Sequence, residues 1–469
     1  MKFCFLINSA PFLSEFLGKI SSEALNDNHE VVVVVNSKVA EYTKKQHFPE
    51  QVRWISKVDW CVEHFDPSKK EFGSFSWREF FPAFGRYTRL RWDYAYSVDT
   101  VSQLCQFFDF VFRTEKPDIV LGEPPTGVFG NIAHHFAKQY RVPVFGLTDS
   151  RLNIAVYDSE STDSRFEKTF KKLSLGNITG RERADLSALI KKIVSHVEKP
   201  AYMGYAKIAF SPIAFVLHYL GRLSELKPVI RYFSKRKVFS RYDYESEVTW
   251  RRMFASPFEL LLRQVRLFSQ KRFFSLMNEH DQFFVYPLHL EPEAATLVLA
   301  APYADQMATI RSIAFSLPFP FKLYVKEHPS AMGLRPDGFY QELQRVPNVV
   351  LISPEQNVPK LMQKSQGIIT LSSTMGFEAL FLGKPVYVLG NVFYAYHPLC
   401  QKVQGFDDLK KRLEADQKQK PKVDDLEGTN LCFMASYVRN TLKGGTMYAL
   451  GPKDTNDYKA FFKALLQRI

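Results

Sequence analysis

Residues 322–390 constrain the fold of this chain most strongly, because they contain two strand-to-loop-to-helix units in succession. In the first unit, the apolar run KLYV ends in Lys326, Glu327, His328 and Pro329. In the second, a strand at 367–371 leads into a helix that begins at about Met375, after the three hydroxyl residues Ser372, Ser373 and Thr374. Parallel sheets built from such units bind ligands outside the carboxyl ends of their strands. The sequence therefore predicts a ligand site where both polar clusters sit at adjacent strand ends.

The chemistry of these clusters favours an anion such as phosphate. Hydroxyl groups, free backbone N–H groups and the positive end of a helix dipole meet at the start of the second helix. His328 adds a proton donor and Lys326 a positive charge. The chain has no GxxxxGK[ST] or GxGxxG loop, so hydroxyls and a helix end are the expected phosphate ligands. The alternative is that Ser372 or Ser373 only caps the helix, and that His328 is an ordinary loop residue.

The chain has 469 residues, too many for one ordinary core, and this length predicts two large domains with an insertion. Residues 1–155 are expected to form a first α/β domain, since EVVVVVN and similar runs are typical of buried parallel strands. Residues 281–405 are expected to form a second α/β domain. Residues 156–280 are interpreted as a helical insertion, and residues 406–469 as C-terminal helices.

Acidic residues also follow strands of the predicted sheets. In the first domain, Glu123 follows one strand and Asp149 the next, so one of them is expected to face the ligand across an interdomain cleft. The alternative is that Asp149 caps a turn and Glu123 pairs with a lysine. In the second domain, His289 and Glu291 follow the first strand and are predicted at the same edge as His328. Either Glu291 or the nearby Glu293 is a candidate for binding ribose or sugar hydroxyls, or for acting in place of Asp149.

Cysteine and carboxylate spacing argue against a metal site. The five cysteines are scattered and form no CxxC pair, which indicates a reducing cytosol and no structural zinc of the usual spacing. No DxD-like pair stands at a loop of the second domain, so neither a catalytic metal nor a cofactor is expected. The first residues, MKFCFLINSAPFL, are interpreted as a strand rather than a signal peptide.

Positive charge is concentrated in residues 207–279, where fourteen Lys and Arg residues stand against six Asp and Glu residues. Basic helices with interleaved aromatic residues fit an anionic membrane surface. Nucleic acid is the competing partner at a pI of about 9.3, but no nucleic-acid motif accompanies the charge. A solvated insertion with core aromatics is the third interpretation. The longest apolar run, 208–220, is shorter than the ~20 residues a bilayer requires, so peripheral membrane attachment is expected.

The central stretch resembles a known family. A His-Pro pair after one strand, followed about forty residues later by SSTMGFEALFLGKPV, is similar to the nucleotide-sugar half of bacterial surface-polysaccharide glycosyltransferases. The capsule polysaccharide biosynthesis family, which includes transferases that use CMP-Kdo, is the family it resembles. Bacterial sialyltransferases carry a similar pair of motifs, and there both contact the CMP phosphate. The resemblance covers residues 283–396, through YPLHLEPEAATLV, LYVKEHP, PNVVLISP and TLSSTMGFEALFLGKPV.

This resemblance implies a GT-B glycosyltransferase, an α/β protein with two Rossmann-like domains facing a cleft. The donor would bind in the C-terminal half, and residues 406–469 would pack back on the N-terminal domain. The implied catalytic residues are Asp149, Glu123 and His328. The implied donor-binding residues are His289, Glu291, Lys326, Glu327, His328, Pro329, Ser372, Ser373, Thr374 and Glu378.

The family pattern bears on Asp149 in particular. In Kdo-type relatives an acidic-acidic-glycine motif follows the corresponding strand, and its aspartate attacks the sugar. Here Thr148-Asp149-Ser150 stands in that place, so Asp149 matches and both neighbours depart from the pattern. Whether Asp149 acts as a nucleophile or a base therefore stays open.

The expected function is transfer of Kdo or a related acidic sugar from a CMP-activated donor to a glycan or lipid-linked acceptor. The enzyme is expected on the cytoplasmic face of the membrane, with the nucleotide sugar, the acceptor and anionic lipid as partners and no nucleic acid. One alternative is a UDP-sugar-dependent transferase, epimerase or hydrolase of the same double-Rossmann fold. Another is a non-catalytic scaffold of a polysaccharide assembly complex.

Overall fold

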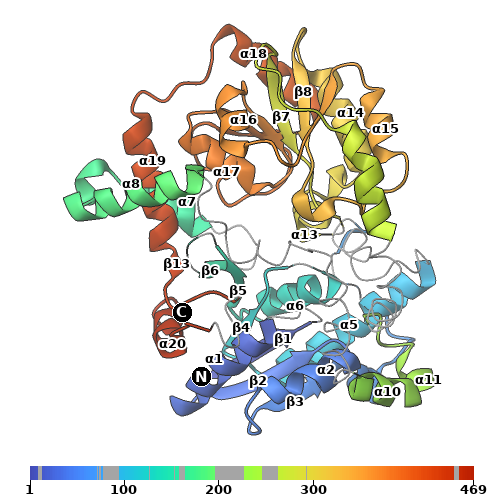
Figure 1. Ribbon diagram of the computed structural model, residues 1–469. Helices are drawn as coiled ribbons and strands as arrows, with labels where there is room; N and C mark the ends of the chain where they lie inside the picture. The colour runs from blue at the N-terminus through green and yellow to red at the C-terminus, as the bar shows by residue number, and fades with distance from the viewer. Residues whose placement is uncertain are drawn as a thin grey trace. The chain divides into compact units, whose positions relative to one another are not determined.

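The computed structural model describes residues 1–8, 13–70, 72, 75–77, 94–125, 127–150, 152, 154–157, 164–195, 226–245, 262–291, 293–447 and 454–469. The chain forms two compact units (Figure 1). The first unit comprises Met1–Ser161, Pro200–Ser256 and Thr441–Ile469, and the second comprises Thr162–Lys199 and Pro257–Asn440.

The first unit is built on a seven-stranded sheet in the order β13-β6-β5-β4-β1-β2-β3. Its parallel strands are β1 (Lys2–Ile7), β2 (Glu30–Val35), β3 (Arg53–Ser56), β4 (Ile119–Gly122) and β5 (Val144–Asp149). At one edge, β6 (Ile154–Tyr157) runs antiparallel to β5, and β13 (Thr441–Leu442) runs antiparallel to β6. Strands covered on both faces need continuous apolar runs, and β1 and β2 are buried along nearly their whole length.

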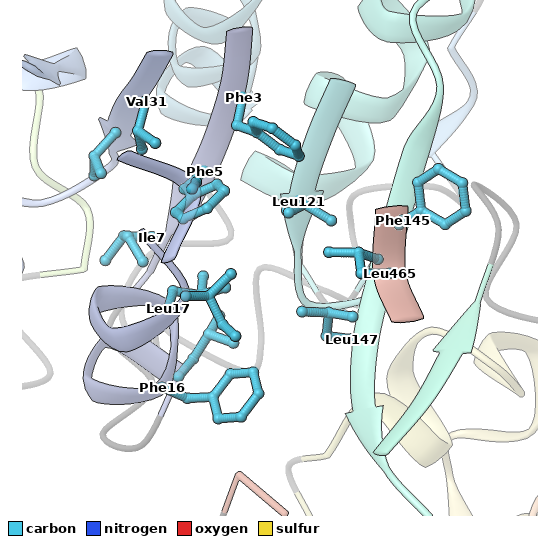
Figure 2. Packing of buried hydrophobic residues seen from close by; sticks show 14 of the residues in the cluster. Phe3, Phe5, Ile7, Phe16, Leu17, Val31, Leu121, Phe145, Leu147 and Leu465 are labelled. Atoms are coloured by element: carbon cyan, nitrogen blue, oxygen red, sulfur yellow. The ribbon is translucent and has the colours of Figure 1, made fainter. Parts of the chain in front are cut away.

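Helices cover this sheet. They are α1 (Leu13–Asn26), α2 (Lys38–Lys44), α3 (Lys57–His64), α5 (Tyr94–Glu115), α6 (Val128–Gln139), α10 (Leu226–Ser234), α11 (Arg236–Phe239) and α20 (Tyr458–Leu466), with a short 3-10 turn, η1 (Lys45–His47). Figure 2 shows Phe3 and Phe5 of β1 packed with Leu17 of α1 and Leu465 of α20. The last helix of the chain thus completes the core of the first unit.

The second unit contains a six-stranded parallel sheet in the order β12-β11-β10-β7-β8-β9. Its strands are β7 (Phe283–Pro287), β8 (Lys322–Lys326), β9 (Val349–Ile352), β10 (Ile368–Thr370), β11 (Val386–Val388) and β12 (Cys400–Lys402). Its helices include α7 (Ser164–Lys172), α8 (Gly180–Ser195), α13 (Ala294–Leu297), α14 (Gln306–Ser316), α15 (Phe339–Gln344), α16 (Val358–Lys364), α17 (Thr374–Phe381), α18 (Phe406–Lys418) and α19 (Leu426–Arg439), with 3-10 turns η2 (Leu175–Asn177), η5 (Lys271–Phe273), η6 (Ala301–Tyr303) and η7 (Pro329–Ala331).

Two Rossmann-like sheets with flanking helices confirm the predicted α/β fold class; the second sheet is parallel throughout, and the first is parallel except for β6 and β13 at one edge. The cleft expected between the two domains stays a prediction. None of the described helices is both long and apolar enough to cross a bilayer.

The chain divides at different places from those expected, because the predicted insertion 156–280 is shared between the units. In the second unit, Phe166 of α7 stacks on Tyr437 of α19, with ring centroids 5.7 Å apart. In the first unit, α10 packs against α2, where the Arg231 guanidinium lies over the Tyr42 ring at 4.6 Å. Residues 196–225 and 246–261 of the expected insertion lie outside the described residues.

The C-terminal region was expected to pack back on the N-terminal domain from residue 406 onward, and this boundary is wrong. Helices α18 and α19 belong to the second unit, and only residues from Thr441 onward join the first. The apolar face of α18 explains its place, since Leu409 and Leu413 are buried in the core of the second sheet. In α20, Phe461 meets Phe16 of α1 edge-on at 5.2 Å, which fixes the final helix on the first unit.

Candidate functional site

Three strands of the second unit bring polar residues to one edge of the sheet. His289 and Glu291 follow β7, Glu327 and His328 follow β8, and Ser372 follows β10. The prediction that these groups share an edge is confirmed, but β8 and β10 are not adjacent. The strand order places β7 between them, because β7 pairs with β8 on one side and β10 on the other. His289 therefore occupies the centre of the site.

His289 links the neighbouring strand ends. Its Nε2 accepts a hydrogen bond from the Ser372 N–H at 3.3 Å, so the ring proton of the neutral imidazole lies on Nδ1. Its backbone N–H donates to Gln306 Oε1 at 2.7 Å, and Gln306 Nε2 returns a bond to the His289 carbonyl at 3.0 Å. Burial, together with the nearby His328 and Arg335, lowers the pKa of His289 to about 3. The imidazole is therefore neutral at physiological pH.

Arg335 holds the acidic residues of the site and was not found from the sequence. Its Nε and one terminal nitrogen each donate to the Glu327 carboxylate at 2.9 Å. The other terminal nitrogen donates to Glu291 at 3.0 Å, and the His289 carbonyl accepts a further bond at 2.6 Å. Tyr340 adds a hydroxyl donor to Glu327 at 2.6 Å. Burial acts to lower the pKa of Arg335, but the bonds and charge of Glu327, with the charge of Glu291, raise it overall.

This network defines what Glu327 and Glu291 do in the fold. Glu327 is 1% exposed, and both of its oxygens accept bonds from Arg335, so it holds Arg335 in place and is not open to a ligand. Glu291 is only partly buried, and burial raises its pKa while Arg335 opposes that shift. Of the three predicted donor-binding carboxylates, Glu291, Glu327 and Glu378, only Glu291 keeps access to solvent.

His328 presents a proton donor. Its Nδ1 accepts the Ser330 N–H at 3.2 Å, which places the ring proton on Nε2. The Nε2 atom has no hydrogen-bond partner among the described residues. Burial lowers the pKa of His328, although Glu327 opposes the shift. A neutral imidazole with a free N–H results, and Pro329 follows it as the first residue of η7.

Lys326 is the last residue of β8 and is 5% exposed. Its ammonium group donates to the Pro354 carbonyl at 3.3 Å and forms no ion pair within the described part of the chain. Burial lowers the pKa of Lys326 to about 8, and Glu327 opposes this shift. A buried cation without a carboxylate partner is costly, so an anionic ligand would stabilise it.

The hydroxyl run has a larger structural role than predicted. Ser373 is the N-cap of α17, and its Oγ accepts the Met375 N–H at 3.2 Å. The Ser372 hydroxyl donates to the Ala295 carbonyl at 2.8 Å, which ties β10 to α13. Thr374 is the first residue of α17 and is partly exposed. Ser373 thus caps the helix, and the start of α17 lies at the site edge, so a role of Ser373 in phosphate binding stays a prediction.

Glu378 lies one turn into α17 and is 1% exposed. Burial raises the pKa of the nearby Tyr394 hydroxyl, and the charge of Glu378 adds to this shift. A role of Glu378 in donor binding stays a prediction.

The first unit has a small pocket at the carboxyl edge of its own sheet. Glu123 follows β4, and its Oε2 accepts a bond from Asn8 Nδ2 at 2.9 Å. Lys44 donates to the Asn8 carbonyl at 2.8 Å, and burial lowers its pKa to about 8 against the charges of Glu245 and Glu123. The pocket is lined by Leu6, Asn8, Glu123, Pro124, Gly127, Phe129, Gly130, Tyr244 and Glu245.

Two of these lining residues come from the region predicted to be a basic insertion. The Asn36 side chain, after β2, donates to the Tyr244 hydroxyl and to Glu245, each at 2.8 Å. The backbone N–H of Lys38 donates to Asp243 at 2.9 Å. Burial raises the pKa of Asp243 to about 7. The acidic YDYE run within a basic stretch is the sequence signal for this contact, and it was overlooked.

Asp149 is held by the C-terminal segment. Its Oδ1 accepts the Met447 N–H at 2.9 Å, and its Oδ2 accepts a short bond from the Thr446 hydroxyl. Both oxygens therefore help to attach residues 441–447 beside β5. Among the described residues, no three His, Cys, Asp or Glu side chains are arranged to hold a metal ion.

A comparison with protein families finds a match for the C-terminal region. Residues 236–427 match the family model described as capsule polysaccharide biosynthesis protein, and this range includes every strand of the second sheet. The match covers less than half of the chain, and over these residues the chain is similar to the capsule polysaccharide biosynthesis family. The resemblance drawn from the His-Pro and Ser-Ser-Thr motifs is confirmed.

Individual relatives are more distant. The capsule polysaccharide modification protein LipA of Neisseria meningitidis serogroup B is 33% identical over 73 residues, which are 16% of this chain and 10% of LipA. The match therefore spans about a tenth of that relative's length. A β-Kdo 2,4 transferase, KpsC of Thermosulfurimonas dismutans, is 17% identical with a TM-score of 0.35, covering 68% of this chain and 80% of its own. A UDP-GlcNAc 2-epimerase from N. meningitidis is 12% identical with a TM-score of 0.25, covering 94% and 99%.

Proposed function

We propose that the protein is a glycosyltransferase of capsule polysaccharide biosynthesis that takes its sugar from a CMP-activated donor. The proposed sugar is Kdo or a related acidic sugar, and the acceptor is a glycan or a lipid-linked glycan. The observation that carries the proposal is that the end of β8 presents both the free Nε2–H of His328 and the Lys326 ammonium, which forms no ion pair with a described residue. These groups lie in a region similar to the capsule polysaccharide biosynthesis family. Two positive or donating groups at a strand edge fit one phosphate.

In the proposed donor complex, the phosphate of CMP accepts a hydrogen bond from His328 and lies near the ammonium of Lys326. The N-terminal end of α17 supplies the positive end of a helix dipole on the other side of β7. As the bond between sugar and phosphate breaks, negative charge grows on the phosphate, and these groups stabilise it. His328 acts as a hydrogen-bond donor rather than as an imidazolium, since its pKa is lowered by burial.

The positions of these groups depend on Arg335. Its fork holds Glu327, the residue before His328, and its bond to the His289 carbonyl ties β7 to the same loop. His289 in turn orients the N–H of Ser372. Arg335 and His289 are therefore positioning residues in this proposal. Glu291, at the rim of the network, is proposed to bind hydroxyl groups of the donor.

The catalytic carboxylate is proposed to come from the first unit, with Glu123 and Asp149 as candidates. Glu123 lines a pocket at a strand edge, where a carboxylate can deprotonate an acceptor hydroxyl. Asp149 matches the family pattern but is bonded through both oxygens to residues 446 and 447. For Asp149 to attack the sugar, that segment would have to release it. Metal-independent transfer remains part of the proposal.

A nucleotide screen tests the donor class. In a thermal-shift series with CMP, UMP, UDP and GDP, CMP is expected to raise the unfolding temperature most, and His328→Ala is expected to remove that shift. Glu279→Ala is a matched control, because Glu279 pairs with Lys360 on the exposed surface. Stabilisation by UDP rather than CMP, with conversion of a UDP-sugar in the absence of acceptor, would favour the epimerase or hydrolase alternative. No stabilisation by any nucleotide would favour the scaffold.

Attachment to the cytoplasmic face of the membrane is part of the proposed function, since the acceptor is expected to be lipid-linked. The basic character of residues 207–279 supports it. Lys235 is an exposed example, just after α10.

A further inference from the structure

Residues 262–270 form a helix of the second unit that exposes three apolar side chains to solvent (yellow-green in Figure 1). Phe268 is 85% exposed, Val265 63% and Leu262 37%. A helix advances by about 100° per residue, so these three positions fall within one sector of about 120°. These three apolar side chains thus form a stripe along one side of the helix, and the exposed Ser269 lies in the same sector.

Contacts with the loop after β8 hold the helix that carries the stripe. On the opposite side of the helix, Arg263 donates to the Met332 carbonyl and to the Ser330 carbonyl, each at 2.8 Å. A Cβ on Gly333 would lie 2.7 Å from the Arg263 carbonyl oxygen, so the loop approaches the helix as closely as glycine permits. The helix is therefore held against the loop that follows β8, with its apolar stripe outward.

Positive charge follows the stripe directly. Lys271 and Arg272 form the start of η5 and are exposed. Neither forms an ion pair with any residue that the structure describes. Leu276, three residues beyond η5, is 71% exposed. Residues 262–276 are called the basic apolar face below.

We propose that the basic apolar face docks on an anionic bilayer, with Phe268 and Val265 inserted at the level of the headgroups. Moving exposed apolar side chains out of water lowers the free energy, and lipid phosphates attract the unpaired cations beside them. A protein partner would instead need a complementary acidic surface. The proposal assigns a surface to the membrane attachment proposed above, and it does not depend on the nucleotide site.

The chain offers a matched control in Phe319, which is 97% exposed and precedes β8 at the other end of that strand. The cations nearest to it in sequence are paired, Lys322 with Asp281 and Arg311 with Glu342, each at 2.8 Å. Phe319 is therefore an exposed phenylalanine whose nearest cations in sequence are paired. Replacing it tests whether loss of any exposed aromatic side chain weakens vesicle binding.

The experiment measures flotation of the full chain with vesicles of phosphatidylcholine alone or mixed with phosphatidylglycerol. Binding is expected only to the mixed vesicles. The double variant Val265→Ser/Phe268→Ser should weaken it at least tenfold, and Lys271→Gln/Arg272→Gln should weaken it about fivefold per charge. Phe319→Ser should bind as the unchanged chain does. Thermal unfolding of all variants checks that the fold is retained.

Three outcomes would overturn the proposal. The first is vesicle binding that the Val265→Ser/Phe268→Ser variant retains in full. The second is an equal loss of binding in the Phe319→Ser variant. The third is self-association in sedimentation that this double variant abolishes without any effect on lipid binding, which would show that a second copy covers the face. CMP binding, measured on the same proteins, reports separately on the nucleotide site.

Discussion

Replacing Arg335 with alanine is predicted to destabilise the second unit by about 3–5 kcal/mol, the usual cost of removing one partner from a buried ion pair. The guanidinium is 4% exposed and bonds to Glu327, to Glu291 and to the His289 carbonyl. Without it, the Glu327 carboxylate stays buried, and its remaining donors are the Tyr340 hydroxyl and the backbone N–H of His328. An uncompensated buried charge dominates the predicted loss.

Two probes separate the units in this experiment. Every tryptophan of the chain falls within the residue ranges of the first unit, so tryptophan fluorescence in urea reports on that unit. Hydrogen exchange of peptides from β8 and β9 reports on the second. Arg335→Ala should raise exchange in these peptides and leave the fluorescence transition nearly unchanged.

Two further variants test the physical reason. Arg311→Ala removes an exposed pair with Glu342 and should cost about 0–1 kcal/mol. Arg335→Met/Glu327→Gln removes both charges and should recover part of the loss, because no buried ion remains. If Arg335→Ala costs no more than Arg311→Ala, the network does not hold a buried charge and the reasoning is refuted.

The remaining predictions concern the site itself. His328→Ala should weaken CMP binding about tenfold by calorimetry, since a charge-assisted bond contributes about 1.5–3 kcal/mol, and Ser373→Ala should add to the loss; unchanged affinity in both would remove the phosphate site. The pKa of His289 is lowered in the folded protein, so the unfolded chain binds more protons, and stability should fall as the pH drops below the ordinary histidine value of ~6.5. Urea midpoints measured between about pH 4 and 7 should therefore depend less on pH in His289→Asn than in the unchanged chain. Asp149→Asn should keep donor affinity while turnover falls by orders of magnitude. In the unchanged protein, a sugar mass added to the intact chain would identify Asp149 as a nucleophile. Normal turnover in Asp149→Asn, with loss of turnover in Glu123→Gln, would instead place the catalytic carboxylate after β4.

Much of the site could be predicted because strands and their ends are local features. The apolar run of β8 ends at Lys326, and the polar residues that follow must lie at the carboxyl edge of any parallel sheet that includes it. The same reasoning placed His289 and Ser372 at that edge. It could not give the strand order, because pairing between β7 and its two neighbours depends on contacts far apart in sequence.

The role of individual side chains was harder to predict, since it depends on partners that no local pattern reveals. Arg335 stands in an unremarkable loop, yet it bonds to Glu291, 44 residues away. Asp149 looked available at a strand end, but a segment 298 residues away bonds to it. The acidic run around Asp243 was hidden within a basic stretch, and it serves the first unit by bonding to the residues after β2.

By itself, the sequence determined the α/β class, two parallel sheets and the group of polar residues at the edge of the second, because apolar runs and their ends require only local burial. The tertiary structure alone decided which of these groups are free and which are bonded. Burial fixes that choice: at 1% exposure Glu327 needs the nearby Arg335, whereas His328, partly exposed, keeps its Nε2–H available. The sequence alone cannot show which polar groups are bonded, because the desolvation of each group depends on atoms that only folding brings together.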